Sequence, residues 1–226
     1  MELMNFLHQV PLFAGLTSAQ YADLAAIITV REYGRGQGIF AEGDEGNGFY
    51  VVMEGLVKIF KLSPEGKEQI LHIFGPGEPF AEAAVFTGST FPAHALALEK
   101  SRALFIPRRA FIELIQRNPS LAMNMLAALS LRLKKFARMI EDLSLKEVPG
   151  RVAAHLLYLS GQQNDSDTVR LEIGKAQLAS LLGTIPETLS RILTRLGKQG
   201  LISIEGPRIT ILDRDGLEDL AAGERL

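Results

Sequence analysis

Six apolar residues in the middle of the chain repeat at the spacing of one helix face. They recur at steps of three, four, three, four and three residues, so all of them fall on one stripe of an α-helix. Asn118-Pro119 is a start signal, because asparagine can cap a helix and proline suits its first position, and Pro149-Gly150 is a stop signal. We therefore predict one helix over residues 118–147, a rod of roughly 45 Å at about 1.5 Å per residue. The stripe comprises Leu126, Leu129, Leu133, Phe136, Ile140 and Leu143.

Two interpretations fit this stripe. An amphipathic helix that packs on its own domain has the same spacing, and its outer positions form a charged, solvated face. A sustained 3-4 spacing also fits a parallel coiled-coil seam with a second copy of the chain. The segments on either side of the helix must decide between them. The charged outer positions are Arg132, Lys134, Lys135, Arg138, Glu141 and Asp142.

The composition limits the classes of protein to which the chain can belong. With 226 residues, of which 47% are hydrophobic and 22% charged, it is typical of a globular protein of one or two domains. No apolar run approaches the roughly 20 residues that span a bilayer, and the first four residues lack the basic start of a signal peptide. The absence of cysteine excludes disulfides, thiolate zinc sites and cysteine-ligated iron-sulfur clusters. We expect a cytoplasmic protein without a membrane partner.

The stretch from residue 29 to residue 107 consists of short β-rich runs separated by glycines. Typical runs are 49–53, 56–60 and 69–74, and Pro64-Glu65-Gly66-Lys67 is a hairpin turn signal. Roughly seven or eight strands, at intervals of about 8–12 residues, are typical of a small antiparallel sandwich or barrel. We therefore predict a β-domain before the long helix.

Shorter elements occupy the rest of an α+β chain. We predict short helices over residues 1–28, with Thr17-Ser18 as a cap, and a helix near 108–117. After residue 150 we predict, in chain order, a helix, a polar loop, a short strand, helices at 175–182 and 185–198, strands at 201–204 and 208–212, and a helix at 214–221. The last two strands are joined by a turn and form a β-wing.

The two helices between residues 175 and 198 contain the residues of a helix-turn-helix. The small Ala179 lies four positions before Gly183, which suits a tight turn, and Leu189 and Ile192 follow on the second helix. The segment 184–187 has the spacing of a capping box, with proline just inside the second helix. A plain helical hairpin is the alternative, but the β-wing that follows favours a winged helix-turn-helix.

The outer side of the second helix is suited to reading DNA bases. Glu187 can accept a hydrogen bond from a cytosine amino group, Arg191 can bind two acceptors of guanine, and Ser190 suits a base edge or a phosphate. The net charge of the chain is −2, yet five basic and two acidic residues between positions 175 and 208 leave a local excess of +3. We predict that the chain contacts double-stranded DNA through Thr184, Glu187, Thr188, Ser190, Arg191 and Arg195.

Together these segments resemble the Crp/Fnr family of transcription regulators over nearly the whole chain. Residues 35–44 (RGQGIFAEGD) and 49–59 (FYVVMEGLVKI) are similar to the sensor domain of the family, and residues 186–191 resemble the Glu-x-x-Ser-Arg pattern of its Fnr and Dnr branches. The resemblance implies a homodimer on a palindromic operator with TTGA-like half-sites, and RNA polymerase as a partner if the protein is an activator. The Arg-Glu-x-x-x-Arg pattern of the cyclic-AMP receptor is only partly present, because Ile185 or Pro186 stands at its first arginine.

The same resemblance implies a domain organisation. An N-terminal double-stranded β-roll, a sensor like a cyclic-nucleotide-binding domain, is expected at 1–117, a central dimerisation helix at 118–147 and a winged helix-turn-helix DNA-binding domain at 148–226. With a sensor before it and a DNA reader after it, the apolar stripe is expected to be the dimer seam. Effector binding beside Phe136 would change how two such helices pair, and a hinge at 148–150 would reorient the recognition helices.

The expected effector site departs from the cyclic-nucleotide pattern of the family. Phe80-Ala81-Glu82 replaces Phe-Gly-Glu, and no arginine occurs between Glu82 and Ala97, where the phosphate-binding Arg-Ser or Arg-Thr belongs. A buried phosphate without a cation would be costly. Phe136-Ala137 replaces the polar pair that contacts the base. Cyclic nucleotide is therefore disfavoured as the effector.

Residues 80–86 and 143–146 most resemble the Dnr and HcpR-like branch, whose members sense nitric oxide through haem. That resemblance implies a haem between the roll and the central helix, beside Phe136, with a histidine or methionine as axial ligand. The candidate ligands are His72, in the strand that matches the effector pocket of the family, and His94, in the next pocket-facing segment; each also suits an ordinary half-buried histidine. Poorer candidates are His8, His155, Met53, Met123 and Met125.

Two alternatives stand beside this function. The same DNA-binding regulator could respond to another small molecule. A cupin-type β-roll enzyme would need clustered histidine and glutamate ligands on neighbouring strands, whereas the four histidines of this chain are single and far apart. No nucleophile-elbow or phosphate-cradling loop motif occurs either, so we predict that the chain is not an enzyme.

Overall fold

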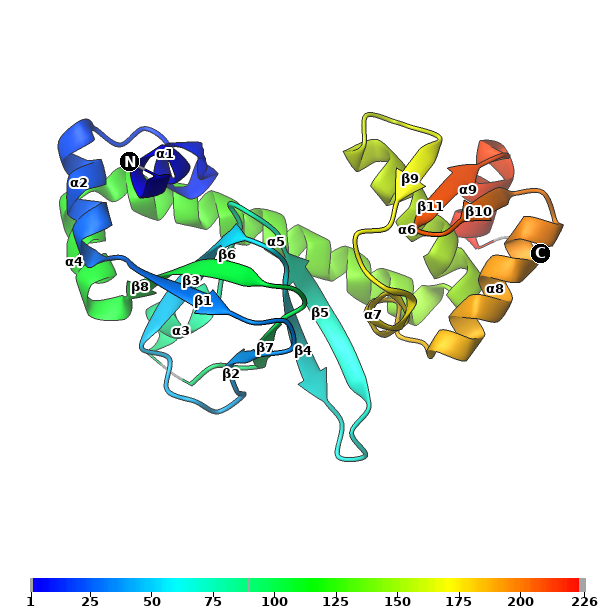
Figure 1. Ribbon diagram of the computed structural model, residues 1–226, viewed down its shortest axis with the longest axis horizontal. Coiled ribbons are helices and arrows are strands. Elements are labelled where there is room, and N and C mark those ends of the chain that lie inside the picture. Colours follow the sequence, from blue (N-terminus) through cyan, green and yellow to red (C-terminus); the bar gives the residue numbers. More distant parts are fainter. Residues whose placement is uncertain (1, 89, 224–226) are drawn as a thin grey trace. The chain divides into compact units, whose positions relative to one another are not determined.

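The N-terminal part of the chain is built around two four-stranded antiparallel sheets (Figure 1). The structure is a computed structural model that describes residues 2–88 and 90–223; residues 1 and 224–226, which end two of the predicted domains, lie outside the described residues. One sheet has the strand order β1-β8-β3-β6 and the other β2-β7-β4-β5. The predicted β-roll is confirmed. Its strands are β1 (Thr29–Tyr33), β2 (Gly38–Phe40), β3 (Gly48–Glu54), β4 (Val57–Leu62), β5 (Glu68–Phe74), β6 (Pro79–Phe80), β7 (His94–Ala97) and β8 (Ser101–Pro107).

Strand β3 is buried on both faces, which explains its uninterrupted apolar sequence. Alternate side chains of a strand point to opposite faces. Phe49, Val51 and Met53 belong to one core, which also contains side chains of the N-terminal helices and which we call the helix-side core. Tyr50 and Val52 belong to a second core, the roll interior, between the two sheets. The other buried residues of the roll interior are Tyr33, Val57, Phe74, Phe80, Phe91, Ala95, Ala97, Ala103 and Phe105.

Helices cover one side of the roll. The Thr17 hydroxyl accepts from the Gln20 amide while the Gln20 side chain accepts from the Thr17 amide, so the predicted cap is confirmed as a capping box. The short α3 (Glu82–Thr87) was not predicted, because its six residues lack a helical period long enough to recognise. The remaining helices of this part are α1 (Glu2–Gln9), the 3-10 turn Pro11–Phe13, α2 (Ser18–Ile27) and α4 (Arg108–Arg117).

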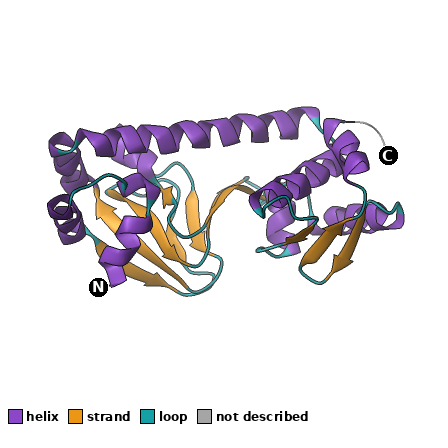
Figure 2. Cartoon of the chain, turned by 90° about the horizontal axis from the view of Figure 1, so that it is seen from above, coloured by secondary structure: helices purple, strands orange, loops and turns teal. Residues whose placement is uncertain are grey.

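The long helix α5 runs from Pro119 to Leu145 (Figure 2). Asn118, the predicted cap, uses its side chain otherwise: its Oδ1 accepts from the Gln20 side chain and its Nδ2 donates to the Leu114 carbonyl at 3.0 Å. Helix α5 begins at Pro119, so the predicted start signal is confirmed, and the buried side-chain amide of Asn118 also joins α2 to α4. The chain divides into two compact units at 133/134, so α5 begins in the first unit and ends in the second.

Pro149-Gly150 begins a helix rather than ending one. Helix α5 stops at Leu145, and α6 (Val148–Gln162) has Pro149 in its first turn, where a missing amide costs nothing. A Cβ on Gly150 would lie 2.9 Å from the Leu220 carbonyl oxygen, so glycine lets α6 approach the last helix closely. The stop prediction is wrong, and the only non-helical residues between α5 and α6 are 146 and 147.

The C-terminal unit combines helices with a three-stranded sheet of order β10-β11-β9, shown in orange in Figure 2. The inner face of the sheet and the helices share one core, which includes Val169, Ile209, Leu189 and Leu217. The predicted winged helix-turn-helix is confirmed. Among the described residues, no helix is long and apolar enough to cross a membrane. The elements after α6 are β9 (Thr168–Arg170), α7 (Lys175–Leu181), α8 (Pro186–Lys198), β10 (Ile202–Glu205), β11 (Arg208–Ile211) and α9 (Arg214–Ala222).

Candidate nucleic-acid interface and effector site

Helices α7 and α8 meet at a tight turn. Gly183 has a φ of 66°, a left-handed conformation that glycine adopts without steric cost. Ala179 and Leu189 are completely buried and Ile192 is 9% exposed, so the facing sides of the two helices are part of the C-terminal core. The small residue, the glycine and the apolar residues therefore take the places that a helix-turn-helix requires.

Thr184 does not cap α8. The N-cap residue is Ile185, which makes no side-chain cap hydrogen bond, and the Thr184 amide donates to the Ala179 carbonyl at 2.9 Å. The predicted capping box is wrong because proline sets the first helical residue at Pro186, which leaves Thr184 one position too early to reach the free amides.

The outer face of α8 carries the other predicted DNA contacts. Glu187, Ser190, Arg191 and Arg195 are exposed, and Thr188 is half-buried. The Arg191 guanidinium donates to the Thr188 hydroxyl at 3.1 Å, so it lies along the helix rather than across it. The structure thus brings five of the six candidate residues onto one exposed helix, with Thr184 in the turn before it.

A buried ion pair lies beside the roll interior. Glu82, the first residue of α3, is 4% exposed, and its Oε1 is paired with the guanidinium of Arg132. Its Oε2 is buried and has no hydrogen-bond partner among the described residues. Arg132 also donates to the Pro79 carbonyl and lies 4.8 Å from the centroid of the Phe74 ring.

Arg132 was predicted on the solvated face of the long helix, and that placement is wrong. Its side chain is only 16% exposed. The spacing along a helix identifies which residues share a face, but the face of Arg132 is covered by strands and a turn from residues 74–82. The buried Glu82 draws the guanidinium inward, because an unpaired carboxylate in an apolar region is costly.

Ala81 stands directly before Glu82 with a φ of 66°. This conformation costs an L-residue about 1–2 kcal/mol, and it is the position at which the family pattern has glycine. Such strain persists only where the surrounding structure determines the backbone completely. The turn at Ala81 is therefore imposed by the packing that brings Glu82 to Arg132.

Aromatic rings pack against one another in the roll interior next to this ion pair. The ring centroids of Phe40 and Phe91 are 3.9 Å apart, those of Tyr50 and Phe80 5.1 Å, and those of Phe74 and Phe80 5.6 Å. Burial raises the pKa of the Tyr50 phenol to about 12. The roll interior beside Glu82 and Arg132 is thus rich in buried aromatic side chains.

The two candidate haem ligands, His72 and His94, lie on opposite faces of the same sheet. His72 is paired across β5 and β4 with Ile59, which packs against the roll interior. His94 is paired with Phe60, the next residue of β4, and stacks on that ring at 5.2 Å. Neighbouring residues of a strand face opposite ways, so the two histidines do not share one iron site.

Their other contacts differ as well. The rings of His72 and Phe74 meet in a T-shaped arrangement with centroids 4.5 Å apart, and the Nε2 of His72 lies 3.9 Å from a carboxylate oxygen of Glu78. The Nδ1 of His94 accepts from the Glu42 amide at 3.2 Å, which commits that nitrogen to the outer surface of the roll. Of the pair, His72 alone faces the roll interior.

The poorer ligand candidates lie elsewhere. The His8 and Tyr21 rings lie tilted against each other, with centroids 3.9 Å apart, beside the helix-side core. His155 belongs to the C-terminal unit, where burial lowers its pKa to about 4. Phe136, predicted to contact the effector, is half-buried and also belongs to that unit. The methionines are core residues or exposed: Met53 and Met125 are in the helix-side core, and Met123 is 66% exposed.

The predicted dimer stripe has two sides. Leu126, Leu133 and Ile140, spaced by seven residues, are 57%, 70% and 65% exposed. Leu129 packs against the helix-side core, and the other two residues of the stripe, Phe136 and Leu143, are half-buried. Leu129, Phe136 and Leu143 are therefore at least partly covered by the chain itself, whereas Leu126, Leu133 and Ile140 form an apolar row that is largely exposed among the described residues.

Known proteins resemble both parts of this chain. Residues 30–118 match the family described as Cyclic nucleotide-binding domain, and residues 150–220 match the Crp-like helix-turn-helix domain. The CRP-like cAMP-activated global transcriptional regulator of Mycobacterium tuberculosis is 30% identical over 94% of this chain and 97% of its own length. The Fumarate and nitrate reduction regulatory protein of Escherichia coli is 32% identical over 84% of this chain and 78% of its own length.

A solved structure has the same fold. FixK2 from Bradyrhizobium japonicum superimposes with a TM-score of 0.77, at 24% identity, over 88% of this chain and 100% of that one. The order of β-roll, long helix and helix-turn-helix is thus shared along the whole alignment.

Proposed function

Because this chain belongs to the Crp/Fnr family of transcription regulators, we propose that it is a homodimer that binds a two-fold symmetric DNA site in response to an effector in its β-roll. It is a DNA-binding transcription regulator with an effector-binding domain, and its relatives are not enzymes. Our proposal goes beyond the family assignment in naming the operator that the protein binds, its homodimeric state and the signal that the β-roll receives. RNA polymerase is a further proposed partner if the protein activates transcription.

The exposed face of α8 supports the proposed operator. Glu187, Ser190 and Arg191 lie within about one helical turn of each other on that face, opposite the buried Leu189. With α8 in the major groove, Arg191 binds guanine and Glu187 accepts from the cytosine amino group, as a TTGA-like half-site requires. Two copies related by two-fold symmetry read half-sites about 34 Å apart.

An Arg191→Ala variant tests this operator. We expect a loss of about 1–3 kcal/mol and a relaxed preference at one guanine of each half-site, measured by titrating duplexes that carry each base at that position. Arg109→Ala is the control, because Arg109 is 94% exposed on α4 and its removal changes the net charge equally. An unchanged base preference in the Arg191 variant would contradict the assignment.

The exposed apolar row supports the proposed dimer. Leu126, Leu133 and Ile140 repeat every seven residues, which is the spacing of one coiled-coil position. A side chain such as Leu133 gains about 1.5–3 kcal/mol when it is buried completely. A parallel partner helix would bury the row from both chains and leave Leu129 in the helix-side core.

For the signal, we propose nitric oxide received through haem, as in the Dnr and HcpR-like branch. Of the four histidines, His72 alone lies on a face that lines the roll interior, beside Phe74. A haem held by one histidine would supply an iron that binds a gas such as nitric oxide. His72 would hold the iron, and the apolar side chains around it would exclude water.

A specific observation favours a second candidate effector. The buried Oε2 of Glu82 has no partner, so it can accept a hydrogen bond from a small molecule that carries a hydroxyl or amino donor. Such a molecule is not a cyclic nucleotide bound in the manner of the family, because no arginine of the roll stands at the phosphate position. One relative is named as cAMP-activated, so cAMP is the compound with which the binding of other candidate effectors should be compared.

The absorption spectrum of protein titrated with hemin separates the two candidates. The haem proposal requires a ligated spectrum for the wild type that shifts with nitric oxide. His72→Ala should abolish it, while His94→Ala, a change on the opposite face of the same sheet, should leave it intact. If the wild type gives no ligated spectrum, the haem proposal fails and the donor-bearing small molecule stands.

Signal transmission is proposed to run through α5. Phe74 contacts both His72 and Arg132, and Arg132 projects from α5. A ligand that moves Phe74 or engages Glu82 therefore changes the anchorage of α5 and the way in which two copies of it pair. We predicted the hinge at residues 148–150. Because Val148 already begins α6, we now propose that residues 146 and 147, between the two helices, form the hinge.

A further inference from the structure

The backbone of Lys146, in the link between α5 and α6, is held from both sides. Its amide donates to the Asp142 carbonyl at 3.1 Å, which extends the hydrogen bonding of α5 by one residue. Its carbonyl accepts from the guanidinium of Arg151, in the first turn of α6, at 3.0 Å. A change of the angle between the two helices at Lys146 therefore requires one of these contacts to break.

The contact with Arg151 is the one that can break without unwinding a helix. The Nη1 of Arg151 also lies 3.5 Å from the carbonyl oxygen of Leu143, in the last turn of α5. The last four carbonyls of a helix have no amide partner within it, and a cation beside them is favourable. Arg151 thus binds the end of α5 from outside, whereas loss of the Lys146 amide contact would open the last turn of α5.

The guanidinium of Arg151 has a second acceptor nearby. Its Nε is buried and makes no hydrogen bond among the described residues. Burial lowers the pKa of Arg151, and the neighbouring Asp142 carboxylate opposes this effect. That carboxylate is paired with the Lys146 ammonium at 2.8 Å. Because arginine binds a carboxylate more strongly than a neutral carbonyl, Asp142 can compete for the guanidinium.

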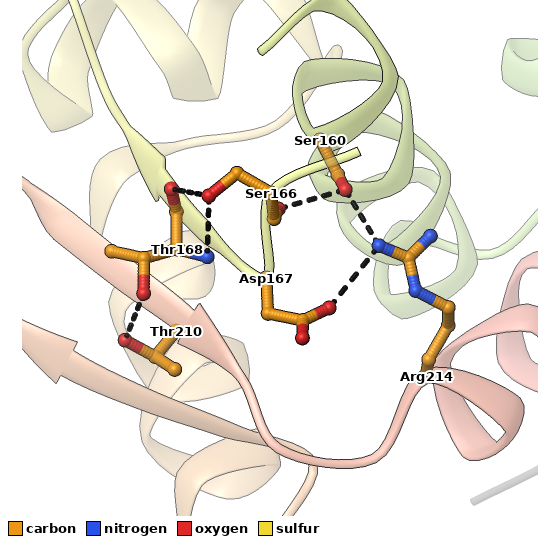
Figure 3. A network of polar contacts seen from close by, with 6 residues as sticks. All are labelled: Ser160, Ser166, Asp167, Thr168, Thr210 and Arg214. Carbon is orange, nitrogen blue, oxygen red and sulfur yellow. Dashed lines mark hydrogen bonds and ion pairs between the residues drawn. The ribbon is translucent and has the colours of Figure 1, made fainter. Parts of the chain in front are cut away.

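The far end of α6 is fixed to the rest of the C-terminal unit by a polar network. The Ser160 hydroxyl, which is completely buried, donates to the Ser166 carbonyl at 2.9 Å and accepts from Arg214 at 2.7 Å (Figure 3). Arg214, the first residue of α9, also donates to the Asp167 carboxylate at 3.3 Å, just before β9. The end of α6 is thus joined to α9 and to the start of β9.

Close packing joins the start of α6 to α9 as well. Gly150 approaches the Leu220 carbonyl so closely that a Cβ would lie 2.9 Å from it. Leu156 is buried in the core that also contains Leu189 of α8. Because α6 is fixed to this core along its length, it turns together with α8. The joint at Lys146 is therefore where the DNA-reading helix changes its orientation relative to the end of α5.

We propose that Arg151 is the positioning residue of the hinge and that its guanidinium exchanges between two sets of acceptors. Bound to the carbonyls of Leu143 and Lys146, it holds α6 at one angle to α5. Paired with the Asp142 carboxylate instead, it releases the Lys146 backbone, and α6 takes a second angle. The inference rests on the proposed regulator, in which α5 carries the dimer seam and α8 reads the DNA.

The distance between two spin labels measures the angle. The chain has no cysteine, so Arg138→Cys on α5 and Gln162→Cys on α6, both at exposed positions, place the labels cleanly. Dilution with unlabelled protein limits the measurement to distances within one chain. The wild type should give two populations, one of them at the distance of the present structure. Electron–electron double resonance resolves both.

Two variants should shift these populations in opposite directions. Lys146→Met leaves the Asp142 carboxylate to Arg151 and should raise the ratio of the second population to the first about three- to tenfold. Asp142→Asn removes the alternative acceptor and should lower that ratio by a similar factor. Lys198→Met, at an exposed position of α8, removes the same charge as Lys146→Met and should leave the ratio unchanged.

Substitutions of Arg151 itself make the result specific. In an Arg151→Met background, neither Lys146→Met nor Asp142→Asn should shift the populations. Arg151→Lys keeps the cation without the planar fork and should retain both shifts at a smaller size. A purely structural arginine would broaden the distances when it is removed, but the two other effects would not depend on it.

Affinity for a palindromic duplex with TTGA-like half-sites links the exchange to DNA binding. Lys146→Met and Asp142→Asn should change the affinity of the protein without effector in opposite directions. Shifted populations with unchanged affinity would support the exchange and contradict the proposed DNA function. Equal populations in Lys146→Met and the wild type, shifts of both variants in one direction, or shifts that persist without Arg151 would overturn the inference.

Discussion

Replacement of Arg132 by methionine should destabilise the N-terminal unit severely. Arg132→Met keeps the length of the side chain over Phe74 but removes the positive charge. Glu82, 4% exposed, then keeps a carboxylate whose two oxygens both lack a hydrogen-bond partner. The change therefore leaves a buried, uncompensated charge.

The size of the effect follows from these contacts. Removing one partner of a buried ion pair costs about 3–5 kcal/mol, and the lost cation–π contact with Phe74 adds about 0.5–1 kcal/mol. Glu82→Gln should cost only about 1–2 kcal/mol, because Arg132 is 16% exposed and keeps the Pro79 carbonyl. In the double variant no charge is buried, so the cost of Arg132→Met should fall by about 2 kcal/mol or more on the Glu82→Gln background.

Urea unfolding followed by tyrosine fluorescence measures these costs. The chain has no tryptophan and four tyrosines, of which Tyr21, Tyr33 and Tyr50 lie in the first unit and report on it. The experiment uses one fixed protein concentration, since a dimer couples unfolding to association. The control is Arg109→Met, which removes an exposed pair with Glu113 and should cost less than about 1 kcal/mol.

Two results would refute the reasoning. If Arg132→Met and Glu82→Gln lower the free energy of unfolding equally, then a buried carboxylate without a partner costs no more than a partly solvated guanidinium without one, and the reasoning is wrong. If the double variant shows the sum of the two single costs, the two groups do not interact.

Three other changes have defined outcomes. Ala81→Gly relieves the left-handed strain at Ala81 and should raise the free energy of unfolding by about 0.5–1 kcal/mol in the same urea experiment; a loss would show that the conformation is unstrained. The folded pKa of His155, about 4, is below its unfolded value of 6.5, so the unfolded state binds the extra proton between these pH values. Stability should be unaffected above pH 6.5 and fall by up to about 1.4 kcal/mol per unit as pH drops from 6.5 to 4, and His155→Gln should flatten this dependence. Leu133→Glu with Ile140→Glu should convert the proposed dimer to a folded monomer in sedimentation velocity, because both side chains are exposed in the single chain; a persistent dimer would exclude the row as the seam.

Local patterns allowed most elements to be predicted. The helix-turn-helix followed from Ala179, Gly183 and the apolar positions after them, because turn geometry and helix periodicity depend on residues only a few positions apart. The strands of the roll followed from apolar runs cut by glycine for the same reason. Helix ends could not be predicted as well from the sequence. Proline is allowed both in the first turn of a helix and after its last turn, so Pro149-Gly150 fits the start of one helix as well as the end of another.

Contacts between distant residues required the tertiary structure. Arg132 has the spacing of a solvated helix face, and only the packing of residues 74–82 against α5 shows that it pairs with Glu82, fifty residues away. Whether His72 and His94 share a face depends on the strand register, which pairs His72 with Ile59 and His94 with the next residue, Phe60. Neighbouring residues of a strand face opposite ways, so a slip of one residue in either pairing would have placed both histidines on one face. Residue types and spacing therefore define the elements, while burial and register, which arise from the whole fold, decide which side chains meet.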